Sequence, residues 1–230
     1  SLSIRWVLMS SLSKKKSTSY NLLKSEDVIN SINCIRTLGS KVKFNRNKCE
    51  INGTGFHIKK KGKIFLDAGN SGTLGRLILG LLINSKKQIK LTGDKSLSKR
   101  DFSRVIIPLK KFGASFNTKK NLPLTMRGLE NPKSIKYYEK KGSAQCKSTI
   151  MLAALKSEGY TEIKAKKSRD HTELLFKYLK IPIKIKKNKN FDLIKLKGVK
   201  KIGPINYQIP GDISSSAFFI VLTVLSNNSQ

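Results

Sequence analysis

The sequence predicts a mixed α/β (α+β) fold in which one supersecondary unit occurs three times around a pseudo-threefold axis. Four Ser-rich or Gly-rich openings each lead into an apolar run of helical length. These openings lie near Ser1, Ser71, Ser143 and Ser214, at intervals of 70, 72 and 71 residues. An ordinary α+β sandwich with coincidental similarities is the alternative, and four matching openings at one interval argue against it.

Each predicted unit contains its elements in a constant order. The apolar helix comes first, over 1–12, 70–82, 142–155 and, at the start of a fourth unit, 211–225. A short strand follows, over 17–23, 87–93 and 160–165. An amphipathic helix comes next, over 25–39, 101–113 and 170–180. Two strands close each unit, at 41–45 with 48–55, 114–118 with 122–128, and 182–187 with 192–198. With one further strand before its first helix the unit is βαβαββ, and three units are expected to pack with helices inside and sheets outside.

The amphipathic helices carry recognisable end signals. Ser25 can cap the first of them, and Gly39 suits its C-terminal exit. Pro108 is expected to kink the second helix. Asp170 and Glu173 have the spacing of a capping box at the start of the third.

The composition is extremely basic, with 47 Lys and Arg against 14 Asp and Glu and a net charge of +33. Such a charge permits a polyanion-binding surface. However, only eight of the basic residues are Arg, and the lysines are scattered along the whole sequence. Aromatic residues do not interleave with them along the chain as a stacking platform requires. A general bias toward solvated lysines is therefore the favoured interpretation.

Other bulk features narrow the class of protein. The sequence contains no run of 18 apolar residues, so it does not predict a membrane span. The chain has three cysteines, Cys34, Cys49 and Cys146. Their odd number and the absence of metal-ligand spacing fit a reducing cytosol. His57 and His171 are too few for a histidine-based metal site. We therefore expect a cytoplasmic protein without a bound metal.

The predicted repeat brings the N-termini of the apolar helices to one end of the domain. Helix N-termini present unpaired N–H groups and partial positive charge, which favour anions. Arg5, Arg76, Arg100 and Arg169 lie at or just inside such helix starts, and they are half of the arginines in the chain. Arginine binds phosphate and carboxylate through a planar fork. The sequence therefore predicts a site for a small phosphorylated or carboxylated ligand.

The stretch LDAGNSGTLGRL at 66–77 is the clearest of the four openings. It lacks the GK[ST] element of a P-loop, and Gly69, Gly72 and Gly75 do not have the spacing of a dinucleotide fingerprint. A plain N-cap turn would explain NSGT equally well. Its recurrence with the other openings favours a ligand-binding role.

Seven stretches, SLSIR, NLLKSEDV, LDAGNSGT, GDKSLSKR, GSAQCKS, SRDHTE and PGDISSSAF, occur in an order that resembles the 5-enolpyruvylshikimate-3-phosphate synthase family. The resemblance covers essentially the whole chain. It implies two domains, each an inside-out barrel of three βαβαββ units, with the active site between them. It also implies transfer of the enolpyruvyl group of phosphoenolpyruvate to the 5-hydroxyl of shikimate 3-phosphate with release of phosphate, without metal or organic cofactor.

The resemblance assigns ligand contacts residue by residue. The shikimate 3-phosphate contacts it implies are Ser1, Arg5, Ser143, Ala144, Gln145, Ser168 and Arg169. The phosphoenolpyruvate contacts it implies are Asn70, Gly72, Thr73, Arg100 and Gln145. The family's proton-transfer residues belong to a second half that has no counterpart in these residues. We therefore expect this chain to be inactive alone, with a substrate-binding domain at 1–210 in three repeats (about 1–69, 70–141 and 142–210). Residues 211–230 would be a crossover and the first helix of a second domain. The expected partners are the two substrates, with no nucleic acid, no membrane and a monomeric state.

Two alternatives stay open at this point. The related UDP-N-acetylglucosamine enolpyruvyl transferases usually carry a reactive cysteine in a mobile loop, and the corresponding stretch at 96–105 has none. A basic non-enzymatic module would bind polyanions but would leave the helix openings unexplained.

Several single residues also have two interpretations. Arg76 is expected to brace the fold and Cys146 to pack inside it, whereas His171 is expected to be exposed. Lys147 could be structural or lie at the rim of the site. The apolar side chains expected in the core are Trp6, Met9 and Met151.

Overall fold

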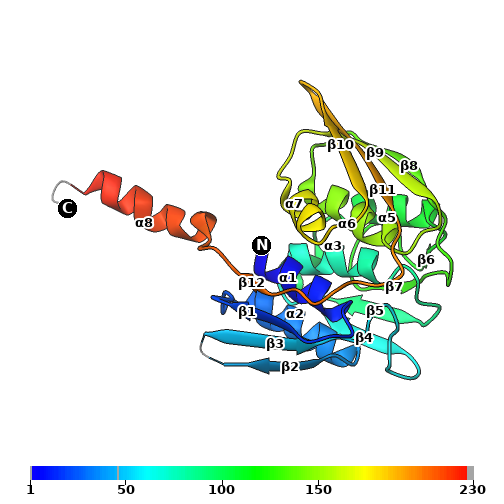
Figure 1. The fold of residues 1–230 in the computed structure, drawn as a ribbon, viewed down its shortest axis with the longest axis horizontal. Helices are drawn as coiled ribbons and strands as arrows, with labels where there is room; N and C mark the ends of the chain where they lie inside the picture. Colours follow the sequence, from blue (N-terminus) through cyan, green and yellow to red (C-terminus); the bar gives the residue numbers. More distant parts are fainter. Residues whose placement is uncertain (1, 46, 227–230) are drawn as a thin grey trace.

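The computed structural model describes residues 2–45 and 47–226, and it has the predicted helix order (Figure 1). The first helices of the four units are α1 (Leu2–Ser11), α3 (Gly72–Leu81), α6 (Ala144–Ala154) and α8 (Ile213–Leu225). The amphipathic helices are α2 (Glu26–Thr37), α5 (Ser103–Lys111) and α7 (His171–Tyr178). A single-turn helix, α4 (Lys95–Ser98), was not predicted because it is too short to show helical periodicity.

Twelve strands form three separate four-stranded sheets among the described residues. The strands are β1 (Ser17–Tyr20), β2 (Lys41–Phe44), β3 (Lys48–Asn52), β4 (Ile64–Asp67), β5 (Ile89–Thr92), β6 (Ser115–Phe116), β7 (Leu124–Arg127), β8 (Lys136–Glu139), β9 (Tyr160–Lys166), β10 (Ile183–Lys187), β11 (Phe191–Lys197) and β12 (Tyr207–Gln208). The sheet orders are β12-β1-β3-β2, β4-β5-β7-β6 and β8-β9-β11-β10. Within the described chain these sheets do not join into a closed barrel.

The three sheets share one topology, which confirms the βαβαββ unit. In each sheet, the opening strand pairs in parallel with the second strand. The second strand pairs antiparallel with the last strand of the unit, which pairs antiparallel with the strand before it. The opening strands β4 and β8 precede α3 and α6. The first sheet receives its opening strand, β12, from the far end of the third repeat. The pairing of β12 with β1 closes the threefold arrangement. It joins distant parts of the chain, so no local sequence pattern predicts it.

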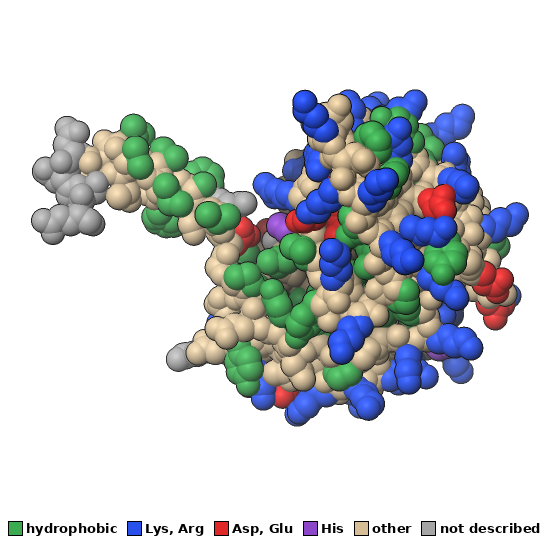
Figure 2. Space-filling model, turned by 45° about the horizontal axis from the view of Figure 1, so that its top comes forward, with side chains coloured by type: hydrophobic (Ala, Val, Ile, Leu, Met, Phe, Trp, Pro, Cys, Tyr) green, Lys and Arg blue, Asp and Glu red, His purple; other side chains and the backbone are tan. Residues whose placement is uncertain are grey.

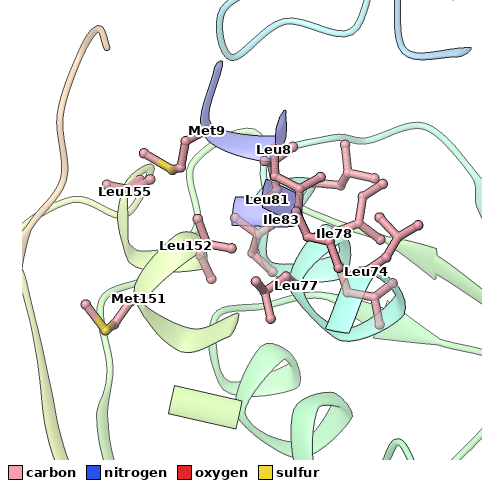
Figure 3. Packing of buried hydrophobic residues seen from close by; sticks show 14 of the residues in the cluster. Leu8, Met9, Leu74, Leu77, Ile78, Leu81, Ile83, Met151, Leu152 and Leu155 are labelled. Atoms are coloured by element: carbon pink, nitrogen blue, oxygen red, sulfur yellow. The ribbon is translucent and has the colours of Figure 1, made fainter. Parts of the chain in front are cut away.

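The helices α1, α3 and α6 form the interior, as predicted (Figure 1). Figure 3 shows Leu8 from α1, Leu77 from α3 and Leu152 from α6 directed into one apolar cluster. Trp6, Met9 and Met151 belong to the same core, as expected. A helix that is apolar on all sides is stable only when other elements surround it, and the outer sheets provide that cover.

Each repeat is held by the same close approach of two backbones. Gly53, Gly128 and Gly198 follow the last strand of their units, and a Cβ atom at any of them would overlap a carbonyl oxygen of the segment after the first helix. The residue after each glycine donates its N–H to that segment. These bonds are Thr54 to Ser11 (3.0 Å), Leu129 to Ile83 (3.0 Å) and Val199 to Leu155 (2.9 Å). Only glycine leaves room for a contact of this kind.

Two predicted helix-end interactions differ in the structure. Ser25 takes the extended N-cap backbone conformation, but its side chain makes no capping bond. The predicted capping box at Asp170 is wrong, because the Asp170 side chain makes no capping bond and Glu173 is turned into the interior. Glu173 instead pairs with a buried lysine, which is a tertiary interaction that overrides the local pattern.

Helix α8 projects away from the three-repeat body after a short crossover (Figure 1). Its apolar side chains are exposed, with Phe218 at 83% and Leu225 at 75% of their full accessible surface. None of the helices in the described ranges is long and apolar enough to span a bilayer.

The contact between α3 and α6 gives a test of the packing. A Cβ atom at Gly80 would overlap the carbonyl oxygen of Thr149 across the helix interface. We expect Gly80→Ala to lower the free energy of unfolding by about 3 kcal/mol, because neither helix backbone can move without disturbing the core. Urea denaturation of the purified chain measures this loss. Gly203→Ala is the control, since no atom lies within 4 Å of the added methyl. Equal stability of the two variants would contradict the proposed packing.

Candidate anion-binding site

The first turns of α3 and α6 meet through side-chain hydrogen bonds. The Gln145 amide donates from Nε2 to Thr73 Oγ1 at 2.9 Å, and its Oε1 accepts from Arg76 Nη1 at 2.6 Å. One turn further along, Thr149 Oγ1 donates to the carbonyl of Arg76 at 3.0 Å. The two helix starts are therefore fixed side by side, as the repeat predicted.

Arg76 is braced as expected. Besides Gln145, it donates from Nη2 to the carbonyl of Asp101 at 3.2 Å and lies over the Phe102 ring at 5.0 Å. Its pKa is lowered by burial and by the positive charges of Arg100 and Arg104. Three guanidinium groups thus lie close enough to repel one another, which is the electrostatic setting that an anion relieves.

Gly72 lies directly beneath two of these guanidinium groups. A Cβ atom at this position would be 2.9 Å from Arg76 Nη1 and 3.1 Å from Arg100 Nη1. Arg100 donates from Nη2 to Asn70 Oδ1 at 3.3 Å, and Asn70 donates from Nδ2 to Asp94 Oδ2 at 2.7 Å. The N-terminal N–H groups of α3 and the two arginines therefore face one small volume, with Asn70 setting the position of Arg100.

The serines at the two openings serve as caps. Ser71 Oγ accepts from the N–H of Leu74, and Ser143 Oγ accepts from the N–H of Cys146, both at 3.2 Å. Ser143 is also held by its own N–H, which donates to the buried Glu139 carboxylate at 2.9 Å. The N-cap interpretation of these openings is thus correct, and the capping leaves the remaining helix N–H groups directed outward.

Arg5 joins the start of α1 to α6 and α7. It is 95% buried, and it donates from Nε to Thr172 Oγ1 at 2.8 Å and from Nη2 to Ser148 Oγ at 3.1 Å. Burial lowers its pKa to about 10, the Glu173 carboxylate raises it and the Arg169 charge lowers it. With a pKa of about 10, the Arg5 guanidinium stays charged at neutral pH.

Arg169 and His171 line a hollow of about 400 Å³, which Arg5 itself does not line. Its lining also includes Leu2, Ser3 and the crossover residues Pro210 and Asp212. The exposed Arg169 and the partly buried His171 stand at the start of α7. Burial and the charges of Arg5 and Arg169 lower the pKa of His171.

Lys147 is structural in this fold. It is fully buried on α6, with its Nζ 2.5 Å from Oε1 of the buried Glu173 on α7. Burying an ion pair is costly unless the partners are well placed, so this pair is a poor source of stability by itself. It does hold α7, with Thr172, against the helix that carries Gln145.

Cys146 packs inside the fold, as expected. Its thiol donates to the carbonyl of Arg104 at 2.9 Å. That carbonyl has no helical N–H to accept from, because the residue four positions later is Pro108, which lies inside α5. Burial raises the pKa of the Cys146 thiol to about 12.

The structure groups most of the predicted site residues but not all of them. It connects Asn70, Gly72, Thr73, Arg100 and Gln145 in one cluster, and it places Arg5 and Arg169 in a second cluster beside the hollow. Ala144 is partly exposed at the start of α6, and Ser168 has a buried Oγ without a hydrogen-bond partner among the described residues. Ser1 lies outside the described residues.

The sequence did not single out Ser148, Thr172 and Asp94, although all three position predicted site residues. Asp94 was detectable in principle, since it caps α4 by accepting from the N–H of Leu97 at 2.6 Å. Ser148 and Thr172 meet Arg5 only in the folded chain, from 143 and 167 residues away in sequence.

Comparison with known proteins bears directly on this geometry. The family model described as EPSP synthase (3-phosphoshikimate 1-carboxyvinyltransferase) matches residues 1–229. The chain belongs to the EPSP synthase family. A 3-phosphoshikimate 1-carboxyvinyltransferase from Caldicellulosiruptor bescii is 38% identical over all of this chain and 54% of its own length. A 3-phosphoshikimate 1-carboxyvinyltransferase from Enterococcus faecalis is 35% identical, again over all of this chain and 54% of its own length.

A solved structure of EPSP synthase from Acinetobacter baumannii has the same fold, with a TM-score of 0.83 and 32% identity. The match covers 99% of this chain and 52% of that one. The chain therefore spans about half the length of the family members it matches. Among the described residues, no group of three His, Cys, Asp or Glu side chains is arranged to hold a metal ion.

The buried thiols give a test of the site's packing. Burial raises the pKa of Cys34, Cys49 and Cys146 to about 12 each. At pH 8 only about 10⁻⁴ of each thiol would be the reactive thiolate. We expect Ellman's reagent to label the folded chain at least ~100-fold more slowly than the chain unfolded in guanidinium chloride. Rapid stoichiometric labelling of any cysteine in the folded chain would contradict this arrangement.

Proposed function

We propose that this chain forms the substrate-binding part of an enzyme that transfers the enolpyruvyl group of phosphoenolpyruvate to the 5-hydroxyl of shikimate 3-phosphate, with release of phosphate. This reaction belongs to the shikimate pathway of aromatic amino-acid biosynthesis. Membership of the EPSP synthase family supports the reaction class. The observation that carries the proposal is the pair of guanidinium groups over Gly72, joined through Gln145 to α6.

The two clusters fit two anionic substrates. We assign phosphoenolpyruvate to the cluster of Asn70, Gly72, Thr73 and Arg100, where helix N–H groups and arginines share one volume. A leaving phosphate gains charge as its bond to carbon breaks, and preorganised donors stabilise that charge. Gln145, which follows Ser143 and Ala144 in sequence, donates to Thr73 of this cluster.

We assign shikimate 3-phosphate to the second cluster, around Arg5 and Arg169 with Ser143, Ala144 and Ser168. The buried Arg5 would supply a fixed charge, and the exposed Arg169 would close over the ligand from the start of α7. The hollow of about 400 Å³ at this end is large enough for a small ring compound. Ser1 remains part of this assignment.

The chemistry also requires proton transfer at the methylene carbon and at the 5-hydroxyl. Among the described residues, the two clusters offer mainly arginines and neutral donors, and the titratable groups beside the second cluster are His171 and Asp212 at the hollow. We propose that this part binds and orients the substrates, and that further acid–base groups come from a second domain. Residues 1–210 would then be the substrate-binding domain and 211–230 the crossover and first helix of the next. The protein would act as a cytoplasmic monomer.

The related transferase acting on UDP-N-acetylglucosamine is the second candidate. Its usual reactive cysteine would have to be one of three thiols that are all buried with raised pKa. No observation on this chain favours it.

Arg100→Ala tests the proposed reaction. In the protein expressed from its complete reading frame, phosphate release should require both phosphoenolpyruvate and shikimate 3-phosphate. We expect Arg100→Ala to lower kcat/KM for phosphoenolpyruvate about 10²- to 10³-fold, because it removes a charge-assisted contact to the reacting phosphate.

Arg127→Ala is the matched control, since it removes the same charge from the exposed end of β7. Its activity should equal that of the parent protein. Absence of phosphate release from the folded parent protein would overturn the proposed function. Equal losses in both variants would overturn the assignment of Arg100.

A further inference from the structure

The outward surface of the third sheet combines lysines with aromatic rings. Side chains alternate along its strands, so that Thr161, Ile163 and Ala165 of β9 are buried while the residues between them point away from the core. We call the outward side chains of β8, β9, β11 and β10 the third-sheet face. It is separate from the helix N-termini that form the anion-binding site.

Strand register places these side chains in rows across the sheet. Tyr138, Lys164, Leu193 and Lys186 form one row. The neighbouring row consists of Lys136, Glu162, Lys195 and Lys184. Neighbouring strands lie about 4.8 Å apart, and successive outward residues along a strand about 6.7 Å apart. The face is therefore a dense grid of cations around apolar side chains.

The charge of this face is one-sided. Among the described residues that line its hollow, Glu162 is the single acidic one, against five lysines. Glu162 is already paired, at 3.5 Å with Lys136 and at 3.0 Å with Lys195. By contrast, the charged residues on the outward face of the second sheet are Lys90, Arg127 and Asp67. The first sheet has three outward lysines, Lys41, Lys43 and Lys48, so the third-sheet face has more lysines than either of the other two sheets.

Lysine ammonium groups lie over aromatic rings across strands, although lysines and aromatic residues do not interleave along the sequence. Tyr138 is 41% exposed with Lys164 at 5.0 Å from its ring centre, and Tyr160 is 53% exposed with Lys195 at 4.7 Å. Lys164 also lies 4.4 Å from the ring of Phe191. These contacts arise from strand register, so residue spacing along the chain does not exclude a stacking platform on this sheet.

The third-sheet face is also hollowed. A depression of about 680 Å³ is lined by β8, β9, β10 and β11, with eight of its twelve lining residues in the two outward rows. Figure 2 shows Lys and Arg side chains surrounding apolar ones over this upper part of the molecule. A hollow of this size accommodates more than one planar ring.

We propose that the third-sheet face binds single-stranded nucleic acid. Lysine ammonium groups would neutralise the phosphates, and bases would stack on Tyr138 and Tyr160. Exposed rings with a cation beside them suit an unstacked base with its own phosphate, whereas a duplex hides its base faces. A lipid surface would use the charge but not the ring geometry. This inference is independent of the proposed enzyme activity, and it replaces the expectation that the chain has no nucleic-acid partner.

Binding of a fluorescein-labelled oligo(U) of about 12 nucleotides to the whole chain tests the proposal. The triple variant Lys164→Gln, Lys184→Gln, Lys186→Gln should raise Kd at least tenfold. It should also flatten the slope of log K against log salt by about 2, since single strands contribute ~0.7 per neutralised phosphate. The control triple variant Lys41→Gln, Lys43→Gln, Lys90→Gln removes the same charge from the other two sheets. It should change Kd less than twofold.

Tyr138→Ser isolates stacking from charge. It should raise Kd about tenfold, whereas Tyr20→Ser, at a tyrosine of the first sheet that is 49% exposed against 41% for Tyr138, should leave Kd unchanged. Thermal unfolding checks that each variant is folded.

Three results would each overturn the proposal. The first is an equal loss in the two triple variants, which would indicate net charge alone. The second is an unchanged Kd for Tyr138→Ser. The third is binding of duplex RNA or of anionic phosphatidylserine vesicles as tightly as oligo(U), with the same sensitivity to the variants.

Discussion

The close packing of α3 against α6 is the constraint on which the rest of the structure depends. Gly80 lets the two helices approach until a methyl group would not fit, and Thr149 bonds to the backbone of α3 at Arg76. These contacts fix the helices in axial register as well as in distance. The first turns then meet, and Gln145 can join Thr73 and Arg76 in one network. The site is therefore a consequence of helix packing in the core.

The same constraint explains why charged groups are tolerated in the interior. Arg5 and Lys147 lie on helices that are otherwise surrounded by apolar side chains, and each is met by a polar group from α7. The desolvation of such groups costs stability, which a purely structural core would avoid. Positive charge held without freedom to rearrange is what an anionic substrate requires. The buried polar groups thus connect the stability of α7 with the electrostatics of the binding end.

Much of this account could be predicted from the sequence because the fold repeats. One helix opening is weak evidence, but four at one interval fixed the order of elements, the interior helices and the end at which arginines gather. The pairing of β12 with β1 could not be predicted, since a two-residue strand has no periodicity and its partner is 188 residues away. Glu173 was misassigned for a similar reason. Its local spacing favours a cap, whereas its partner Lys147 is near only in the folded chain.

The sequence predicted some contacts of the site residues and not others. Asn70 and Gly72 flank one helix start, which local sequence encodes, whereas Arg100 reaches Asn70 from 30 residues away after the parallel pairing of β4 with β5. Arg5 depends on two hydroxyl partners from the third repeat, which the sequence did not indicate. The rings and lysines of the third sheet were missed because their proximity arises from strand register, which residue spacing along the chain does not contain.

The most direct test of the central claim, that three repeats build one anion-binding end, is an NMR titration of the ¹⁵N-labelled chain with shikimate 3-phosphate, followed at the arginine side-chain Nε–H resonances. We predict saturable shifts for Arg5 and Arg169 with shikimate 3-phosphate, and for Arg76 and Arg100 when phosphoenolpyruvate is then added, because the two arginines at Gly72 belong to the phosphoenolpyruvate cluster. Arg36 and Arg127, at the far end of α2 and on the outer face of the second sheet, should not shift. Equal shifts at all six arginines, or none at the first four, would contradict the account.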